Sequence, residues 1–246
     1  MYPFAHVRDA QNALWAGIRR NLADVVDAPE HLDFDTELHV AWHRSDLLLG
    51  QTCGWPLVTE MDGVVDVVGT FAVDVPFASA DGSYRSVLVA RKPISLADWK
   101  ATPDVHVARN NSDSLSGWVS LCAAWGGVPS RVTETGAHLE SVRAVAAGRV
   151  DLAMIDAVSL QFVAEQEPFV AGRVHIIGHG PTIPCLPLVM AKGLASHRDG
   201  VRAALTAAML DPSLAAARSR LRISGFVPLD AAAYEPVLAL MPPTAG

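Results

Sequence analysis

The densest run of hydrogen-bonding residues in the chain is Asn110–Gly117, with the sequence NNSDSLSG. It joins an apolar run typical of a strand, Val105–Ala108, to a helical stretch at about Ser114–Trp125. Hydroxyls and unpaired backbone amides would meet at the start of that helix, where the partial positive charge favours an anion. Capping of the helix explains the same serines without any ligand, so both interpretations stay open. The candidate contacts to a small anion are Ser114, Ser116 and Gly117.

Two further junctions place a titratable residue between a strand and a helix. Asp156 directly follows the apolar run Leu152–Ile155, where it would either cap the next helix or accept from a ligand hydroxyl, amine or protonated phosphonate oxygen. His138 follows Thr133–Ala137 in the first turn of another helix and could donate a hydrogen bond to an acidic ligand. A purely structural histidine is the alternative.

Two more junctions carry neutral polar groups. Gln51 and Thr52 follow the apolar residues Leu47–Leu49, and they are read either as ligand contacts or as an ordinary polar turn. Tyr84 and Ser86 open another predicted strand and would bring a phenol and a hydroxyl toward the same region. A tyrosine at a strand edge is the alternative there.

Signatures of enzymes and metal sites are missing from the sequence. It holds no G-x-S-x-G, H-E-x-x-H, P-loop or G-x-G-x-x-G pattern. His39 and His43 are four residues apart, but their stretch reads as a strand, where they need not share a face. Cys53, Cys122 and Cys185 lie far apart without a C-x-x-C pair, so they are expected to be buried thiols. We therefore expect neither a metal nor a cofactor, and no catalytic residues.

These junctions require an alternation of strands and helices to position them. The predicted strands are Leu47–Leu49, Val64–Val73, Val87–Val89, Val105–Ala108, Leu152–Ile155, Val174–Ile177 and Leu186–Met190. The predicted helices are Phe4–Ala23, Ser114–Trp125, His138–Ala147, Ala157–Glu165, Arg198–Leu210, Pro212–Leu221 and Asp230–Leu240. This order predicts an α/β fold with a mostly parallel sheet covered on both faces, and ligands bind beyond the carboxyl ends of such strands.

Composition excludes several classes of protein. The 246 residues are 50% hydrophobic and 18% charged, which argues against disorder. The net charge is -7 and the 19 Lys and Arg residues are scattered, so nucleic acid is not an expected partner. No apolar run approaches the roughly 20 residues of a spanning helix, so no membrane insertion is expected. The N-terminus also lacks the features of a secretory signal.

Four motifs together resemble the phosphate, phosphite and phosphonate-binding components of ABC importers, over nearly the whole chain. They are Tyr84-x-Ser86, Ser114–Trp118 (SLSGW), Thr135–His138 (TGAH) and Ser141–Asp156. The resemblance implies the type 2 periplasmic-binding-protein fold, in which two α/β lobes joined by two crossing strands close on a ligand. It also implies that residues 1–89 and 180–246 form lobe one and that residues 90–179 form lobe two.

The same resemblance assigns roles to individual residues. Ser114, Ser116 and the Gly117 amide match the helix start that holds the phosphonate oxygens. Tyr84, His138 and Asp156 match other ligand contacts, and Tyr2 matches an aromatic residue near the first strand. Two hydroxyls of the family pattern are replaced by Leu115 and Ala137, and Asp113 adds a carboxylate nearby. A fully ionised phosphate is therefore a poor match, whereas an organic phosphonate, a zwitterion or another small acid stays open.

The function that these residues indicate is that of a solute-binding protein for an ABC importer, with a small anionic ligand and a transporter permease as partners. A cytoplasmic enzyme or a ligand sensor on the same scaffold is the alternative, with His138, Asp156 or Asp113 as acid or base. The chain opens at Met1-Tyr2, where this fold usually begins with a buried strand. Either the start was placed too far downstream, which would put the protein in the periplasm or on a lipid anchor outside the inner membrane, or this is a trimmed or cytoplasmic relative.

Overall fold

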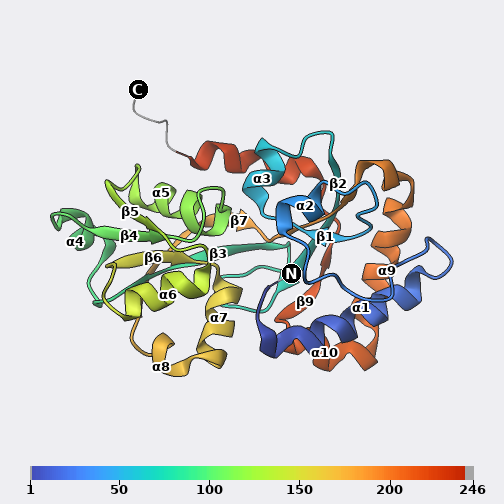
Figure 1. Cartoon of the computed structure of the whole chain (residues 1–246), viewed down its shortest axis with the longest axis horizontal. Coiled ribbons are helices and arrows are strands. Elements are labelled where there is room, and N and C mark those ends of the chain that lie inside the picture. The colour runs from blue at the N-terminus through green and yellow to red at the C-terminus, as the bar shows by residue number, and fades with distance from the viewer. Residues whose placement is uncertain (1, 242–246) are drawn as a thin grey trace. The chain divides into compact units, whose positions relative to one another are not determined.

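The computed structural model describes residues 2–241, which divide into two compact units (Figure 1). The first unit comprises residues 2–74, Ala78–Ser83 and Pro184–Glu235. The second comprises Val75–Phe77, Tyr84–Ile183 and residues 236–241. The chain thus leaves the first unit and returns to it, and each unit is built on a sheet of its own.

The first unit is built on a four-stranded sheet in the order β1-β8-β2-β9. Its described strand pairs are all antiparallel, with Gly50 opposite Val189, Val65 opposite Ala191 and Thr70 opposite Val227. Helix α1 packs against α9 and α10, and α9 and α10 both contact β9. The bounds of the strands are β1 (Gly50–Gln51), β2 (Val65–Val73), β8 (Pro187–Ala191) and β9 (Ile223–Val227).

Helix α1 (Arg8–Leu22) has the apolar face that the sequence predicts, because Leu14, Trp15, Ile18 and Leu22 are all buried. A second apolar cluster, which includes Trp42, Met61, Val67 and Tyr234, fills the core beside β2 and β8. The other helices of this unit are α2 (Leu38–Trp42), α3 (Gly54–Thr59), α9 (Arg198–Leu210) and α10 (Ala215–Arg220). Its 3-10 turns are η1 (Ala5–Val7), η3 (Lys192–His197), η4 (Pro212–Leu214) and η5 (Ala231–Ala233), and η6 (Glu235–Leu240) begins where the unit ends.

The second unit contains a five-stranded sheet in the order β5-β4-β6-β3-β7. Strand β4 is parallel to β5 and to β6, whereas β3 runs antiparallel to β6, with Val87 opposite Ile155. The strands are β3 (Ser83–Ala90), β4 (His106–Arg109), β5 (Arg131–Glu134), β6 (Leu152–Ile155) and β7 (His175–Pro184). The helices are α4 (Leu96–Ala101), η2 (Leu115–Val119), α5 (Ser120–Trp125), α6 (His138–Ala146), α7 (Ala157–Gln166) and α8 (Pro168–Ala171).

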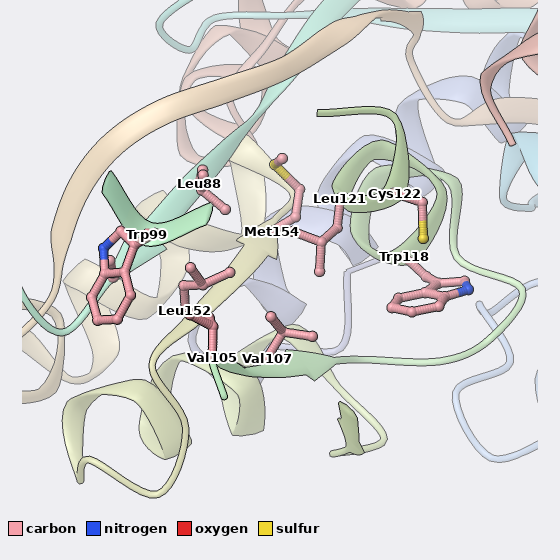
Figure 2. Packing of buried hydrophobic residues seen from close by; sticks show 10 residues of the cluster. Leu88, Trp99, Val105, Val107, Trp118, Leu121, Cys122, Leu152 and Met154 are labelled. Carbon is pink, nitrogen blue, oxygen red and sulfur yellow. The ribbon is translucent and has the colours of Figure 1, made fainter. Parts of the chain in front are cut away.

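The central strands β3, β4 and β6 are mostly buried on both faces, as expected of strands that read as continuous apolar runs. On one face Leu88, Val107, Leu152 and Met154 pack against Trp118, Leu121 and Cys122 of η2 and α5 (Figure 2). The alternate residues Val87, Val89, Ala153 and Ile155 are also buried, and α6 packs against β4 and β6.

Four strand ends meet at one edge of this sheet. Strands β4, β5 and β6 are parallel, so their carboxyl ends lie at the same edge. Strand β3 is antiparallel to β6, so its first residues lie at that edge too. Asn110, Thr135, Asp156 and Tyr84 are therefore neighbours although they are far apart in the sequence.

The structure confirms the predicted α/β class and most of the predicted elements, with four corrections. The sheets are not mostly parallel, because buried apolar runs look alike in parallel and antiparallel pairs. Residues Leu47–Leu49 precede a strand instead of forming one. The stretch with His39 and His43 forms helix α2, which ends at Trp42, and the segment from Asp230 forms 3-10 turns instead of an α-helix.

Candidate ligand-binding site

Ser114 organises the loop after β4. Its Oγ accepts hydrogen bonds from the Gly117 amide at 3.0 Å and from the Asn110 Nδ2 at 2.9 Å. Ser114 therefore caps the following helix, as the structural interpretation of the sequence required. Because both lone pairs of the oxygen are used, the Ser114 hydroxyl hydrogen is left to donate elsewhere.

The helix that follows Ser114 begins as a π-helix over Leu115–Val119 and continues as α5. The Val119 amide donates to the Ser114 carbonyl at 3.0 Å, and the Ser120 hydroxyl donates to the Leu115 carbonyl at 2.7 Å. Single π turns inside helices are uncommon and are found frequently at functional sites.

Position 117 must be a glycine because the Asn110 side chain lies against it. A Cβ at this position would lie 1.9 Å from the Asn110 Oδ1 and 3.0 Å from the Ser114 Oγ. Both neighbours are buried, with Asn110 only 8% exposed. No residue with a side chain fits at position 117 without displacing Asn110.

His138 lies against the serine-rich loop from the first turn of α6. Its Nε2 is 3.1 Å from the Ser116 Oγ and 3.5 Å from the Asn110 Nδ2. The Nδ1 atom is buried and has no hydrogen-bond partner within residues 2–241. Burial lowers the pKa of His138 below its ordinary 6.5, and the Asp156 carboxylate opposes that shift only in part. The imidazole is therefore neutral at neutral pH.

The turn that leads into α6 is held to the loop after β4. The Gly136 amide donates to the Asn110 carbonyl at 2.8 Å, and the Thr135 amide donates to the Arg109 carbonyl at 2.9 Å. Ala137 occupies the N-cap position of α6, which has no side-chain capping bond. The first amides of α6 consequently add uncapped donors beside His138.

Tyr84 and Asp156 form a buried pair at the same edge of the sheet. The Tyr84 hydroxyl donates to the Asp156 Oδ2 at 2.5 Å, and the Ser159 amide donates to the Oδ1 at 2.7 Å. Each of the two paired side chains is 2% exposed. Asp156 thus caps α7, which was one of its two predicted roles. Ser86, two residues along β3, is fully buried, and its hydroxyl has no hydrogen-bond partner in the described chain.

The structure therefore brings Tyr84, Ser86, Ser114, Ser116, Gly117, His138 and Asp156 together in the second unit. The other three candidates belong to the first unit, and their part in ligand binding stays a prediction. The Tyr2 carbonyl accepts from Gln11 at 2.8 Å, and the Gln51 carbonyl accepts from the Trp42 indole at 3.1 Å. Thr52 is buried, with its hydroxyl 3.7 Å from the Met61 sulfur.

One residue of the cluster was not singled out from the sequence. Asn110 contacts Ser114, Gly117 and His138, yet it stood out only as one member of a polar run. Its place as the first residue after β4 is the signal that could have identified it.

The cluster offers hydroxyl, imidazole and amide donors next to one buried carboxylate, a set suited to an acidic head group that also carries a proton or an amine. Within residues 2–241, His, Cys, Asp and Glu side chains form no group of three or more able to hold a metal ion. None of the helices in that range has the length and apolar character to cross a membrane.

A family described as ABC transporter, phosphonate, periplasmic substrate-binding protein matches residues 46–234. No match emerges among curated protein sequences.

Solved structures share the fold. The PhnD1 protein of Prochlorococcus marinus, in complex with methylphosphonate, is 13% identical with a TM-score of 0.73, covering 94% of this chain and 92% of that one. A binding-protein component of a Pseudomonas aeruginosa ABC phosphonate transporter is 17% identical, also with a TM-score of 0.73, covering 94% and 81%. A Xanthomonas citri protein bound to ATP is 17% identical with a TM-score of 0.67, covering 96% and 92%. These similarities confirm the predicted type 2 periplasmic-binding fold.

Proposed function

The chain belongs to the family of periplasmic substrate-binding proteins of phosphonate ABC transporters, and from this premise we propose that the cluster around Ser116 and His138 binds the acidic head group of a small phosphonate-like ligand. The proposal rests chiefly on the 3.1 Å approach of the Ser116 Oγ to the His138 Nε2. The contact joins the loop after β4, which carries the Ser114 and Ser116 hydroxyls, to the start of α6, where the first amides of that helix lie.

The donors suit a negatively charged ligand for electrostatic reasons. The Ser114 hydroxyl hydrogen, the Ser116 hydroxyl and the uncapped first amides of α6 can each donate to an anionic oxygen. Bonds of this kind, in which the acceptor is charged, are roughly twice as strong as neutral ones. The neutral His138 adds one N–H to the same set.

Asp156 narrows the class of ligand. Its carboxylate is buried and accepts from Tyr84 and Ser159, and it places an acidic group beside the hydroxyl and imidazole donors of the cluster. A fully ionised phosphate would meet like charge there, whereas a singly protonated phosphonate or a ligand amine would donate to it. We therefore expect a ligand whose acidic head group keeps a proton or is accompanied by an amine, with methylphosphonate among the candidates.

The same family membership supports the remaining assignments. We propose that the protein binds its ligand without converting it, that it works outside the inner membrane, and that it delivers the ligand to the permease of an ABC importer. Recovery of an unaltered ligand after incubation with the protein tests the first of these assignments.

The binding proposal is tested by melting and calorimetry with methylphosphonate, other phosphonates, phosphite, sulfonates, small carboxylates and phosphate. A ligand at 100 times its Kd should raise the stability by about 2.7 kcal/mol. Ser116→Ala and His138→Ala should weaken that binding. The matched controls Ser112→Ala and His175→Ala, both at exposed positions, should leave it unchanged. If none of these anions raises the melting temperature, or if all four variants bind alike, the assignment is wrong.

A further inference from the structure

Asn110 connects the parts of the proposed site. It is 8% exposed, and its carbonyl accepts from the Gly136 amide at 2.8 Å. Its side-chain nitrogen lies 2.9 Å from the Ser114 Oγ and 3.5 Å from the His138 Nε2. One buried side chain therefore touches both the capping serine and the histidine.

These contacts select one form of the His138 ring. A neutral imidazole carries a single N–H, on either Nδ1 or Nε2, and the neighbours of the ring decide which. The amide nitrogen of Asn110 can only donate, so the Nε2 that faces it accepts. The proton is then on Nδ1, which is buried and has no partner within residues 2–241.

The same contact affects Ser116. The Nε2 has one in-plane lone pair, and the Asn110 amide and the Ser116 hydroxyl are both placed to donate to it. The Ser116 hydroxyl is the nearer donor, at 3.1 Å against 3.5 Å, and when it turns to donate to a ligand the Asn110 amide remains as the donor to Nε2. Without Asn110, the serine is the remaining donor to the ring in this cluster.

We propose that Asn110 is a positioning residue that holds His138 as its Nδ1–H tautomer, so that Nδ1–H and the Ser116 hydroxyl are both available as donors to the ligand. The inference rests on the proposed function for its ligand, but the tautomer itself is a property of the unliganded protein. Packing holds the Asn110 side chain beside the ring, because Gly117 leaves the space that the Asn110 Oδ1 occupies.

The first experiment needs no ligand. Two-bond 1H–15N NMR distinguishes protonated from unprotonated ring nitrogens, and the signals of His138 are assigned with His138→Gln. We expect protonated Nδ1 and unprotonated Nε2 at neutral pH in the wild type. In Asn110→Asp, a carboxylate faces Nε2 and joins Asp156 as a charge acting on the ring, so Nε2 should become protonated and the ring should titrate at higher pH. Ser112→Asp adds the same charge to an exposed position of the loop and should change neither.

A wild-type ring protonated on Nε2 overturns the proposal, even if no variant folds. So does an unchanged tautomer and titration in Asn110→Asp.

The second experiment measures binding of methylphosphonate by calorimetry. Asn110→Ala should weaken it by about tenfold or more, because two donors lose their orientation. Equal affinity in wild type and variant contradicts the role of Asn110 toward the ligand. Failure of the wild type to bind methylphosphonate would count against the proposed ligand class, whereas the NMR result still decides the role of Asn110.

Discussion

Replacing Tyr84 with phenylalanine tests the buried pair at the edge of the second sheet. The substitution keeps the ring and removes the hydroxyl that donates to the Asp156 Oδ2 at 2.5 Å. Hydrogen bonds to charged groups contribute about 1.5–3 kcal/mol, and removing one partner of a buried carboxylate costs a similar amount. We therefore expect the free energy of unfolding to fall by about 2 kcal/mol.

Urea denaturation followed by circular dichroism measures this change, and Tyr234→Phe provides a matched comparison. Tyr234 is also fully buried, but its hydroxyl donates to the neutral carbonyl of Cys185 at 2.9 Å. Loss of this hydroxyl should lower the free energy of unfolding by about 1 kcal/mol. A double-mutant cycle with Asp156→Asn isolates the pair energy. If Tyr84→Phe destabilises the protein no more than Tyr234→Phe does, the carboxylate is not the partner that gives the bond its strength.

Three other expectations concern buried groups. Gly117→Ala should lower the free energy of unfolding in urea by about 1–3 kcal/mol, because the added Cβ would lie 1.9 Å from the Asn110 Oδ1. Gly127→Ala places its Cβ in open space and should change the free energy of unfolding by less than about 0.5 kcal/mol. The lowered pKa of His138 means that the unfolded chain binds more protons at this residue as the pH falls below 6.5, so stability present above that pH is lost toward lower pH. Melting curves of His138→Gln should show a smaller loss over this range, and an equal loss would place the titrating group elsewhere. Burial raises the pKa of Cys122 to about 11, so mass spectrometry should find its thiol unlabelled by an alkylating reagent at pH 8 until the protein unfolds, and rapid labelling of the native protein would contradict its burial.

Several site residues and helix α1 were predictable from short segments of the sequence. Ser116, His138 and Asp156 were identified because polar residues directly after apolar strands collect at the carboxyl edge of a sheet. Helix α1 was predictable from its spacing of apolar residues. Each of these signals lies within a few neighbouring residues.

Most of the features that the sequence did not predict depend on contacts between residues that are far apart in the sequence. The direction of β3 relative to β6 is set by how the chain returns, and buried strands look alike in both arrangements. Helix α2, with five residues, is too short to show a helical period around His39. The role of Asn110 depends on a contact with His138, which is 28 residues away.

The π turn at Leu115–Val119 changes the directions in which side chains project before and after it. Each extra residue in a helical turn rotates the downstream part of the helix by about 100° relative to the upstream part. Ser116 of this turn faces His138, and Leu121 and Cys122, just downstream, lie in the apolar core. A one-residue deletion in this turn would turn either the polar loop or the core residues away from their partners, so length here is as constrained as residue type.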